Sequence, residues 1–227
     1  MSDHPLDVPA RAALTSRHSH LARRRGGAIC YDADIVPFAA DDGSDTAALA
    51  GLVAPGQLAA FLQASRMAEP DGFETVIRDE AVQLVATRPF MAVDDARIEP
   101  LGSSDAVGML ALAEATKPGP FTLRALDLGR FYGIRQDGAL VAMAGERMAC
   151  DGYVEVSGVC VAETARGQGL ARLLSQHVAA GIAAAGDVPF LHAFASNDAA
   201  IGLYRSLGFE PRAAMQVGIF RRLAAQG

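Results

Sequence analysis

Several residue types are scarce in this chain: its 227 residues include no tryptophan, a single lysine and only three cysteines. A disulfide framework or a zinc site is not expected from Cys30, Cys150 and Cys160, because they are too few and too scattered. We therefore expect a reducing, cytoplasmic environment and no bound metal. The formal net charge of −6 leaves no excess of basic groups for a phosphate backbone, so nucleic acid is not an expected partner.

Long hydrophobic runs are also absent. The longest uncharged stretch has 20 residues, from Thr46 to Ser65, and Pro55-Gly56-Gln57 interrupts it, so we expect no membrane span. The first 25 residues carry five arginines and no apolar stretch typical of a signal peptide. Hydrophobic residues still make up 51% of the chain and charged residues 20%, a composition that can bury a globular core.

From about residue 96 the apolar pattern becomes regular. Turn signals such as Gln136-Asp137-Gly138 separate short apolar runs, and helix starts and stops are marked by capping residues, glycine and proline. We expect strands over 96–101, 131–135, 139–148, 153–161, 189–195 and 214–220, and helices over 105–116, from 170 onward and over 198–207.

The first 90 residues are less regular. We expect helices over 10–24 and 46–53, and strands over 35–38, 57–62 and 73–86. When the sequence is shifted by 63 residues, positions 33–56 lie over 96–119 and nine of the 24 positions agree, including Pro55/Pro118 and Gly56/Gly119. This match favours a degenerate duplication of a strand–helix–loop unit, with chance in an alanine-rich chain as the alternative.

The segment Arg166-Gly167-Gln168-Gly169-Leu170-Ala171 lies where an expected strand ends and a helix begins. Free N–H groups of a first helical turn, together with the helix dipole, favour negative charge in front of them. Glycines in the loop let a phosphate approach these amides closely. The segment therefore predicts a pyrophosphate site, and a plain glycine-lined turn is the alternative.

A second motif follows at a defined distance. The order R-x-x-G-x-A is followed 26 residues later by N-x-x-A-x-x-L-Y-x-x-x-G-F, which runs from Asn197 to Phe209. Together the two motifs resemble the GNAT family of N-acetyltransferases over about residues 96–222. The segment 146–161 and the second motif also resemble the glycine N-acyltransferase-like branch of that family.

The resemblance implies a mixed, mostly antiparallel twisted sheet with flanking helices, preceded by a smaller, degenerate α/β half-repeat. It implies a division into an N-terminal region, 1–92, and an acyl-CoA-binding catalytic domain, 93–227. Acetyl-CoA would be the acyl donor, bound by the backbone of two neighbouring segments: Val159, Cys160 and Val161, and Arg166, Gly167, Gln168, Gly169, Leu170 and Ala171.

Three side chains are candidates for the chemistry. Glu155 is the candidate general base, because burial in a strand would raise its pKa; a solvated residue at the outer end of the strand is the alternative. Tyr204 is the candidate acid that protonates the leaving thiolate, and a core tyrosine with a backbone partner is the alternative. Asn197 would contact the pantetheine arm, cap the helix that follows it, or do both.

The acceptor is written less clearly in the sequence. The resemblance places part of the acceptor pocket in the loop 116–127, where Phe121 or Arg124 would face an amine or amino-acid-like acceptor; a plain ordered loop is the favoured interpretation for each. His177 and His192 are expected to pack or to lie at the surface. The leading interpretation is an N-acetyltransferase; a non-catalytic acyl-CoA-binding module is the alternative. Residues 1–92 would shape the pocket or mediate contacts in a homodimer.

Overall fold

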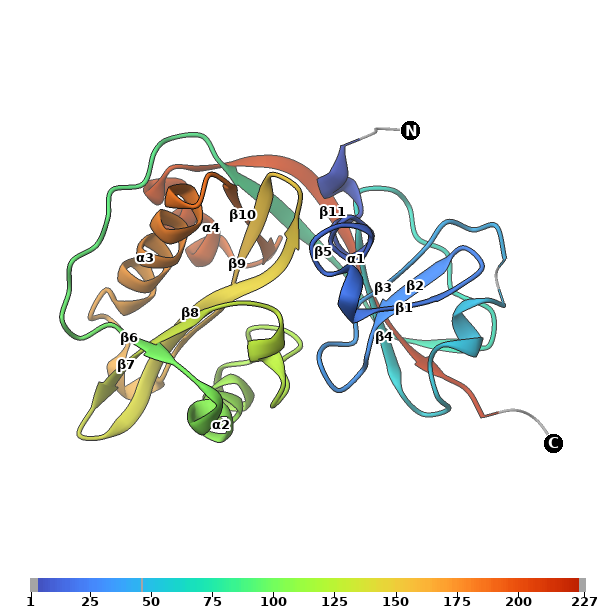
Figure 1. Ribbon diagram of the computed structural model, residues 1–227, viewed down its shortest axis with the longest axis horizontal. Coiled ribbons are helices and arrows are strands. Elements are labelled where there is room, and N and C mark those ends of the chain that lie inside the picture. Colours follow the sequence, from blue (N-terminus) through green and yellow to red (C-terminus); the bar gives the residue numbers. More distant parts are fainter. Residues whose placement is uncertain (1–3, 46, 225–227) are drawn as a thin grey trace.

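The computed structural model describes residues 4–45 and 47–224 and has an α/β architecture with two sheets (Figure 1). The small sheet has the order β1-β2-β3 and the large sheet has the order β4-β11-β5-β10-β9-β8-β7-β6. The strands of the small sheet are β1 (Ala22–Arg25), β2 (Ala28–Tyr31) and β3 (Ala39–Asp41). The strands of the large sheet are β4 (Leu58–Gln63), β5 (Phe73–Ala86), β6 (Glu99–Leu101), β7 (Phe131–Gln136), β8 (Ala139–Cys150), β9 (Tyr153–Val161), β10 (Val188–Phe194) and β11 (Phe209–Arg222).

Every neighbouring pair in the large sheet is antiparallel except β9 and β10, which are parallel. The predicted mixed, mostly antiparallel sheet is therefore confirmed. Three predicted elements have the bounds that the sequence indicates: β5, β9 and the helix over 198–207. Local chemistry explains the turns: Asp137 and Gly138 both have positive φ in the β7–β8 hairpin, as a tight two-residue turn requires.

The α-helices are α1 (Pro9–Thr15), α2 (Ala106–Thr116), α3 (Leu170–Ala184) and α4 (Asp198–Leu207). They cover both faces of the sheet, as the alternation along β10 shows. Phe190 packs in a cluster with residues of α1, whereas Leu191 and Ala193 pack with residues of α3 and α4. On β8, Met143 likewise packs with α2 and its neighbour Ala144 with α3. Thus α1 and α2 lie on one face, and α3 and α4 lie on the other.

The N-terminal region differs most from the predictions. The expected helix over 10–24 ends at Thr15 and is followed by a 3-10 helix and β1. The segment 35–38, expected as a strand, is a turn and a loop that form only a single bridge at Phe38 before β3 begins. Instead of a helix over 46–53 there is the short 3-10 helix η3 (Leu49–Gly51), and Thr46 lies outside the described residues. At an offset of 63, the eleven-residue α2 would lie over this region, so the helix expected from the repeat is not formed, and the duplication itself stays a prediction.

The large sheet continues across the predicted division at residue 92. β5, from the first region, pairs with β10 along one edge and with β11 along the other. Figure 1 shows β5 and β11 running side by side from the helical part of the molecule to the part that contains β1–β3. Regions 1–92 and 93–227 therefore share one sheet, and their division stays a prediction. No helix in the described part of the chain is long and apolar enough to cross a membrane.

Candidate active site

A cleft of about 930 Å³ opens where the two parallel strands separate. β9 and β10 are paired at three positions, from Val188↔Tyr153 to Phe190↔Glu155, and beyond that point no pairing joins them among the described residues. The C-terminal half of β9 and the end of β10 thus become the two edges of an opening in the sheet. A parallel pair that stops part-way leaves backbone N–H and C=O groups free to meet a ligand.

The cleft passes through the sheet and is lined from both faces. On one face it is bordered by Ala200 and Tyr204 of α4 and by Asn197, which precedes that helix. On the other face it is bordered by the loop after α2 and by residues of the N-terminal region, including Phe38 and Phe61. The N-terminal region therefore contributes directly to one wall of the cleft, which is the first of the two roles expected for it.

Two β-bulges lie beside the cleft, one in β8 and one in β9. In β9, Ser157 to Cys160 spans one residue more than the facing segment of β8, and Gly158 has a positive φ of 61°. The bulge reverses the alternation, so that Cys160 packs toward α2 while Val159 and Val161 pack against the α3 cluster. Glu155 therefore does not share a side with Val159 and Val161, as simple alternation would predict.

Replacement of Gly158 by alanine is expected to destabilise the fold by about 1–3 kcal/mol. The positive φ disfavours any residue with a Cβ, and that atom would lie 2.8 Å from Cε1 of Phe131. Gly108→Ala is the matched control, because Gly108 is an exposed residue of α2 with open space around it and should gain helix stability. Urea unfolding midpoints of the two variants would measure the contrast, and equal stability of Gly158→Ala and wild type would contradict it.

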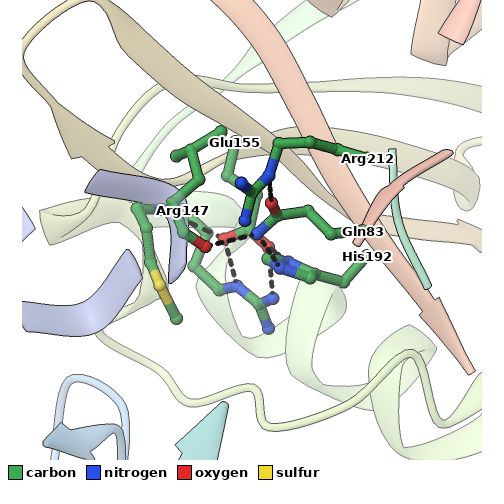
Figure 2. Close-up of polar contacts among 7 residues, drawn as sticks. Gln83, Arg147, Glu155, His192 and Arg212 are labelled. Atoms are coloured by element: carbon green, nitrogen blue, oxygen red, sulfur yellow. Dashed lines mark hydrogen bonds and ion pairs between the residues drawn. The ribbon is translucent and has the colours of Figure 1, made fainter. Parts of the chain in front are cut away.

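Glu155 is completely buried and sits at the centre of a polar network (Figure 2). Arg147 donates to both of its carboxylate oxygens, from Nε at 2.9 Å and from Nη2 at 2.6 Å. His192 Nδ1 lies 2.7 Å from Oε1, and the backbone N–H of Met148 lies 3.4 Å from Oε2. The bulge in β8 falls between Glu146 and Ala149, which directs Arg147 and the N–H of Met148 toward Glu155.

Gln83 determines how the proton is placed on His192. Arg212 donates to Oε1 of Gln83, so the other end of that amide is the Nε2 donor, which reaches Leu6 O at 2.8 Å and His192 Nε2 at 2.8 Å. Nε2 of His192 must then accept, and Nδ1 carries the proton that is donated to Glu155. Burial lowers the pKa of His192, in keeping with this uncharged tautomer.

The acidity of Glu155 differs from the sequence-based prediction. Burial by itself would raise the pKa of its carboxyl, but the charge and hydrogen bonds of Arg147, together with His192, lower it to about 2. The expected rise is therefore wrong, and so is the alternative of a solvated residue. The reason is that Arg147 and His192 are brought to the same point by two different strands.

Tyr204 lies at the cleft with its side chain largely buried. Burial, with a smaller effect from Cys160, raises its pKa to about 12, so its hydroxyl stays protonated at neutral pH. No hydrogen bond to that hydroxyl is formed within residues 4–45 and 47–224, in contrast to the backbone partner of the core alternative. Asn197 lines the same cleft and also caps α4, since its Oδ1 accepts from the N–H of Ala200 at 3.0 Å.

The glycine segment before α3 has the backbone that the sequence predicts. Gly167 and Gly169 have φ values of 78° and 74°, and a Cβ at either position would meet nothing within 4 Å. Gly169 is the N-cap residue of α3, so the amides of the first turn follow directly. The side chain of Gln168 accepts a hydrogen bond from Gln136 at the end of β7. The segment 166–171 lies outside the lining of the cleft.

Comparisons with known proteins agree with this geometry. Residues 131–217 match the family model described as FR47-like protein. The chain is 41% identical to a protein of Novosphingobium aromaticivorans assigned to the GNAT family of acetyltransferases; the TM-score is 0.93, and the match covers 98% of this chain and 100% of that one. The chain belongs to the GNAT family.

More distant members share the fold. A GCN5-related N-acetyltransferase from Kribbella flavida is 20% identical, with a TM-score of 0.60 over 98% of this chain and 97% of that one. A GCN5-related N-acetyltransferase-like protein from Streptococcus suis is 14% identical, with a TM-score of 0.60 over 94% of both chains. No curated protein matches the chain.

In this GNAT protein, one of the two candidate acceptor residues lines the cleft and the other does not. Arg124 is an exposed residue that pairs with Asp127, and Phe121 packs edge-on against Phe131 while lining the cleft. Arg147 and His192, which line the cleft, gave no motif in the sequence that would assign them to a site. The available signals were His192 in the otherwise apolar β10 and the adjacent charged residues Glu146 and Arg147 in the otherwise apolar β8.

Cys160 and Val161 are the last two residues of β9. Cys160 is buried against α2, and burial raises its pKa to about 11. The three cysteines are all buried and unpaired. In the described ranges, no group of three or more His, Cys, Asp or Glu side chains is placed to hold a metal ion.

Proposed function

We propose that this GNAT protein transfers an acetyl or another short acyl group from coenzyme A to an amine by direct attack. The observation that carries the proposal is the cleft through the sheet between β9 and β10, with the unpaired hydroxyl of Tyr204 on one wall. A thioester held in this opening is accessible from both faces. The donor would enter from the α4 face and the acceptor from the face that carries Phe38.

The donor side fits the residues that the sequence singled out. The amides from Gln168 to Ala171 would hold the pyrophosphate, because the first turn of α3 has free donors and the open glycines leave room for phosphate oxygens. The backbone on either side of the Gly158 bulge, at Val159 to Val161, would hold the pantetheine arm and polarise the thioester carbonyl. Arg166 would add a positive charge beside the pyrophosphate.

The reaction forms one bond and breaks one. The amine nitrogen attacks the thioester carbon, the C–S bond breaks, and the amine gives up a proton to solvent water. Tyr204 donates the proton that the leaving thiolate requires, a role that its high pKa and unpaired hydroxyl support. The tyrosinate is then reprotonated from solvent, so that the net reaction is acyl-CoA plus amine giving amide plus free coenzyme A.

Glu155 acts on this site indirectly. Because its oxygens are engaged by Arg147, His192 and the Met148 N–H and its pKa is about 2, it is a weak proton acceptor. We therefore propose that Glu155 is a positioning residue that holds Arg147 at the cleft, and that the amine binds in its uncharged form. The resemblance to the glycine N-acyltransferase-like branch stays a hypothesis that rests on the segment 146–161 and the Asn197–Phe209 motif.

A donor-binding and turnover experiment tests the proposal. Acetyl-CoA should raise the melting temperature, and a panel of amines should include members that release free coenzyme A thiol. Gly169→Ala should weaken acetyl-CoA binding about tenfold, because the charge-assisted hydrogen bonds from the amides of the segment 166–171 are disturbed. Gly186→Ala is the matched control, since Gly186 also has positive φ and open space but lies in the turn before β10.

The outcomes separate the alternatives. Thiol release that depends on an amine supports acyl transfer. Stabilisation by acetyl-CoA without turnover for any amine would instead show a non-catalytic acyl-CoA-binding module. Equal acetyl-CoA affinity for Gly169→Ala and Gly186→Ala would show that the segment 166–171 does not bind the donor.

A further inference from the structure

Arg147 presents one edge of its guanidinium group to the cleft. Its Nε and Nη2 are bound to Glu155, and within residues 4–45 and 47–224 no hydrogen bond engages Nη1. Arg147 lines the cleft, and its side chain is 12% exposed. In Figure 2 the guanidinium group faces Glu155 with one edge and turns the other away from the network. Two N–H donors on Nη1 are thus available to a molecule in the cleft.

The orientation of this guanidinium group is fixed before any ligand binds. Glu155 holds it from one side with two hydrogen bonds, and the ring of Phe38 lies under it with 4.7 Å between Cζ and the ring centroid. A planar cation held in this way loses little conformational freedom when it accepts a further partner. Phe38 belongs to the N-terminal region, so that region helps to set the position of Arg147.

The position of Arg147 is on the acceptor side. Phe38 and the loop after α2 border the cleft on the face opposite α4, and Arg147 lies among them. Arg147 also borders a small adjoining hollow together with Ser157 and Gly158, the part of β9 next to the expected thioester. A group bound at Nη1 would therefore lie a short distance from the reacting thioester carbon. The carboxylate and the amine of an amino acid are likewise a short distance apart.

Resting on the proposed acyl transfer, we propose that the acceptor is an amine that also carries a carboxylate, and that Nη1 of Arg147 binds this carboxylate. Guanidinium groups bind carboxylates with short, charge-assisted hydrogen bonds. Lys117 adds a second positive charge to the cleft, and Asp34 and Glu114 add acidic groups that attract the amine end. The cleft thus has both charges of an amino-acid-like acceptor represented in its lining.

Matched pairs of acceptors test the proposal. Each pair consists of an amino acid and the amine that lacks its carboxylate, such as phenylalanine with 2-phenylethylamine and alanine with ethylamine, compared at equal concentrations of uncharged amine. For the wild-type protein, kcat/KM should favour the amino acid by roughly 10- to 100-fold. The preference should lie in the KM for the acceptor and not in the KM for acetyl-CoA.

The variant for this test is Arg147→Gln/Glu155→Gln, which removes both charges together and so leaves no unpaired buried ion. Its preference for the amino acid should fall to about 1. The control is Arg130→Gln/Glu146→Gln. In the wild-type protein Arg130, just before β7, forms an ion pair with Glu146 of β8, with 2.5 Å between Nη2 and Oε1, and neither residue lines the cleft. This control should keep the wild-type preference.

A binding arm tests the same contact without turnover. In the presence of free coenzyme A, N-acetylphenylalanine should bind the wild-type protein more tightly than N-acetyl-2-phenylethylamine does, measured by titration calorimetry. The Arg147→Gln/Glu155→Gln variant should not distinguish them. Equal binding of the two products by the wild-type protein, or an unchanged preference in the variant, would overturn the proposal. Turnover of amines without carboxylate preference would overturn it and leave acyl transfer standing, whereas absence of all turnover would count against acyl transfer.

Discussion

The variant Tyr204→Phe is expected to lower kcat by roughly 10²- to 10³-fold while acetyl-CoA binding changes little. Tyr204 lines the cleft and its hydroxyl has no partner within the described ranges, so its removal leaves no buried group unpaired. A pKa of about 12 means that it holds its proton throughout the pH range of an assay. Without it, the thiolate of coenzyme A must leave without a neighbouring acid.

Initial rates of thiol release, together with acetyl-CoA affinities from calorimetry, check this expectation. Tyr132→Phe is the matched control, because Tyr132 is a half-buried tyrosine of β7 that packs on the ring of His177 and does not line the cleft. The rate of the control should stay within about twofold of wild type. Equal rates for Tyr204→Phe and wild type would remove Tyr204 from the chemistry.

The variant Glu155→Gln is expected to destabilise the fold by about 3–5 kcal/mol. Glutamine keeps the shape but not the charge, so Arg147 is left nearly buried without a counter-ion. One of the two amide positions also becomes a donor that points toward the N–H groups of Arg147, His192 or Met148. Adding Arg147→Gln to this variant should recover much of the loss, because the buried cation is then removed as well.

Unfolding in urea as a function of pH gives a second, independent measure of the same contact. The folded pKa of Glu155 is about 2, below the ordinary value of 4.5, so the stabilisation is present in full above about pH 4.5 and is lost as the pH falls toward 2. The wild-type protein should lose about 3 kcal/mol over this range from Glu155 alone. Glu155→Gln should lack this component, and identical acid sensitivity of the two proteins would contradict the assignment.

The pH dependence of the rate separates a positioning role from a general base. If Glu155 accepted the proton, Glu155→Gln would remove an ionisation from the pH profile of kcat. If Glu155 is a positioning residue, the folded Glu155→Gln protein should have a pH profile of kcat with the same shape as wild type. Its KM for the acceptor should be raised. The buried network favours the second outcome.

Local chemistry was sufficient for much of the fold. Helix α4 begins after its capping residue Asn197 and ends before Gly208, as the sequence predicts. The Asp137-Gly138 turn forms the predicted hairpin between β7 and β8. These features depend on interactions within a few residues, which is why they can be read without the rest of the chain. The N-terminal region could not be read in this way, because β1, β2 and β3 are short and depend on packing against distant residues.

The candidate site divides in the same way. The sequence by itself determined the glycine segment before α3, the motif that contains Tyr204, and through them the GNAT family. Only the tertiary structure decided what surrounds Glu155, since its partners Arg147 and His192 lie on two other strands and two β-bulges alter which side chains share a face. One added residue in a strand reverses its alternation, so a pattern with period two cannot place side chains beyond the bulge. The proposed donor site is local in sequence, whereas the proposed acceptor site is assembled from strands and loops that meet only in the fold.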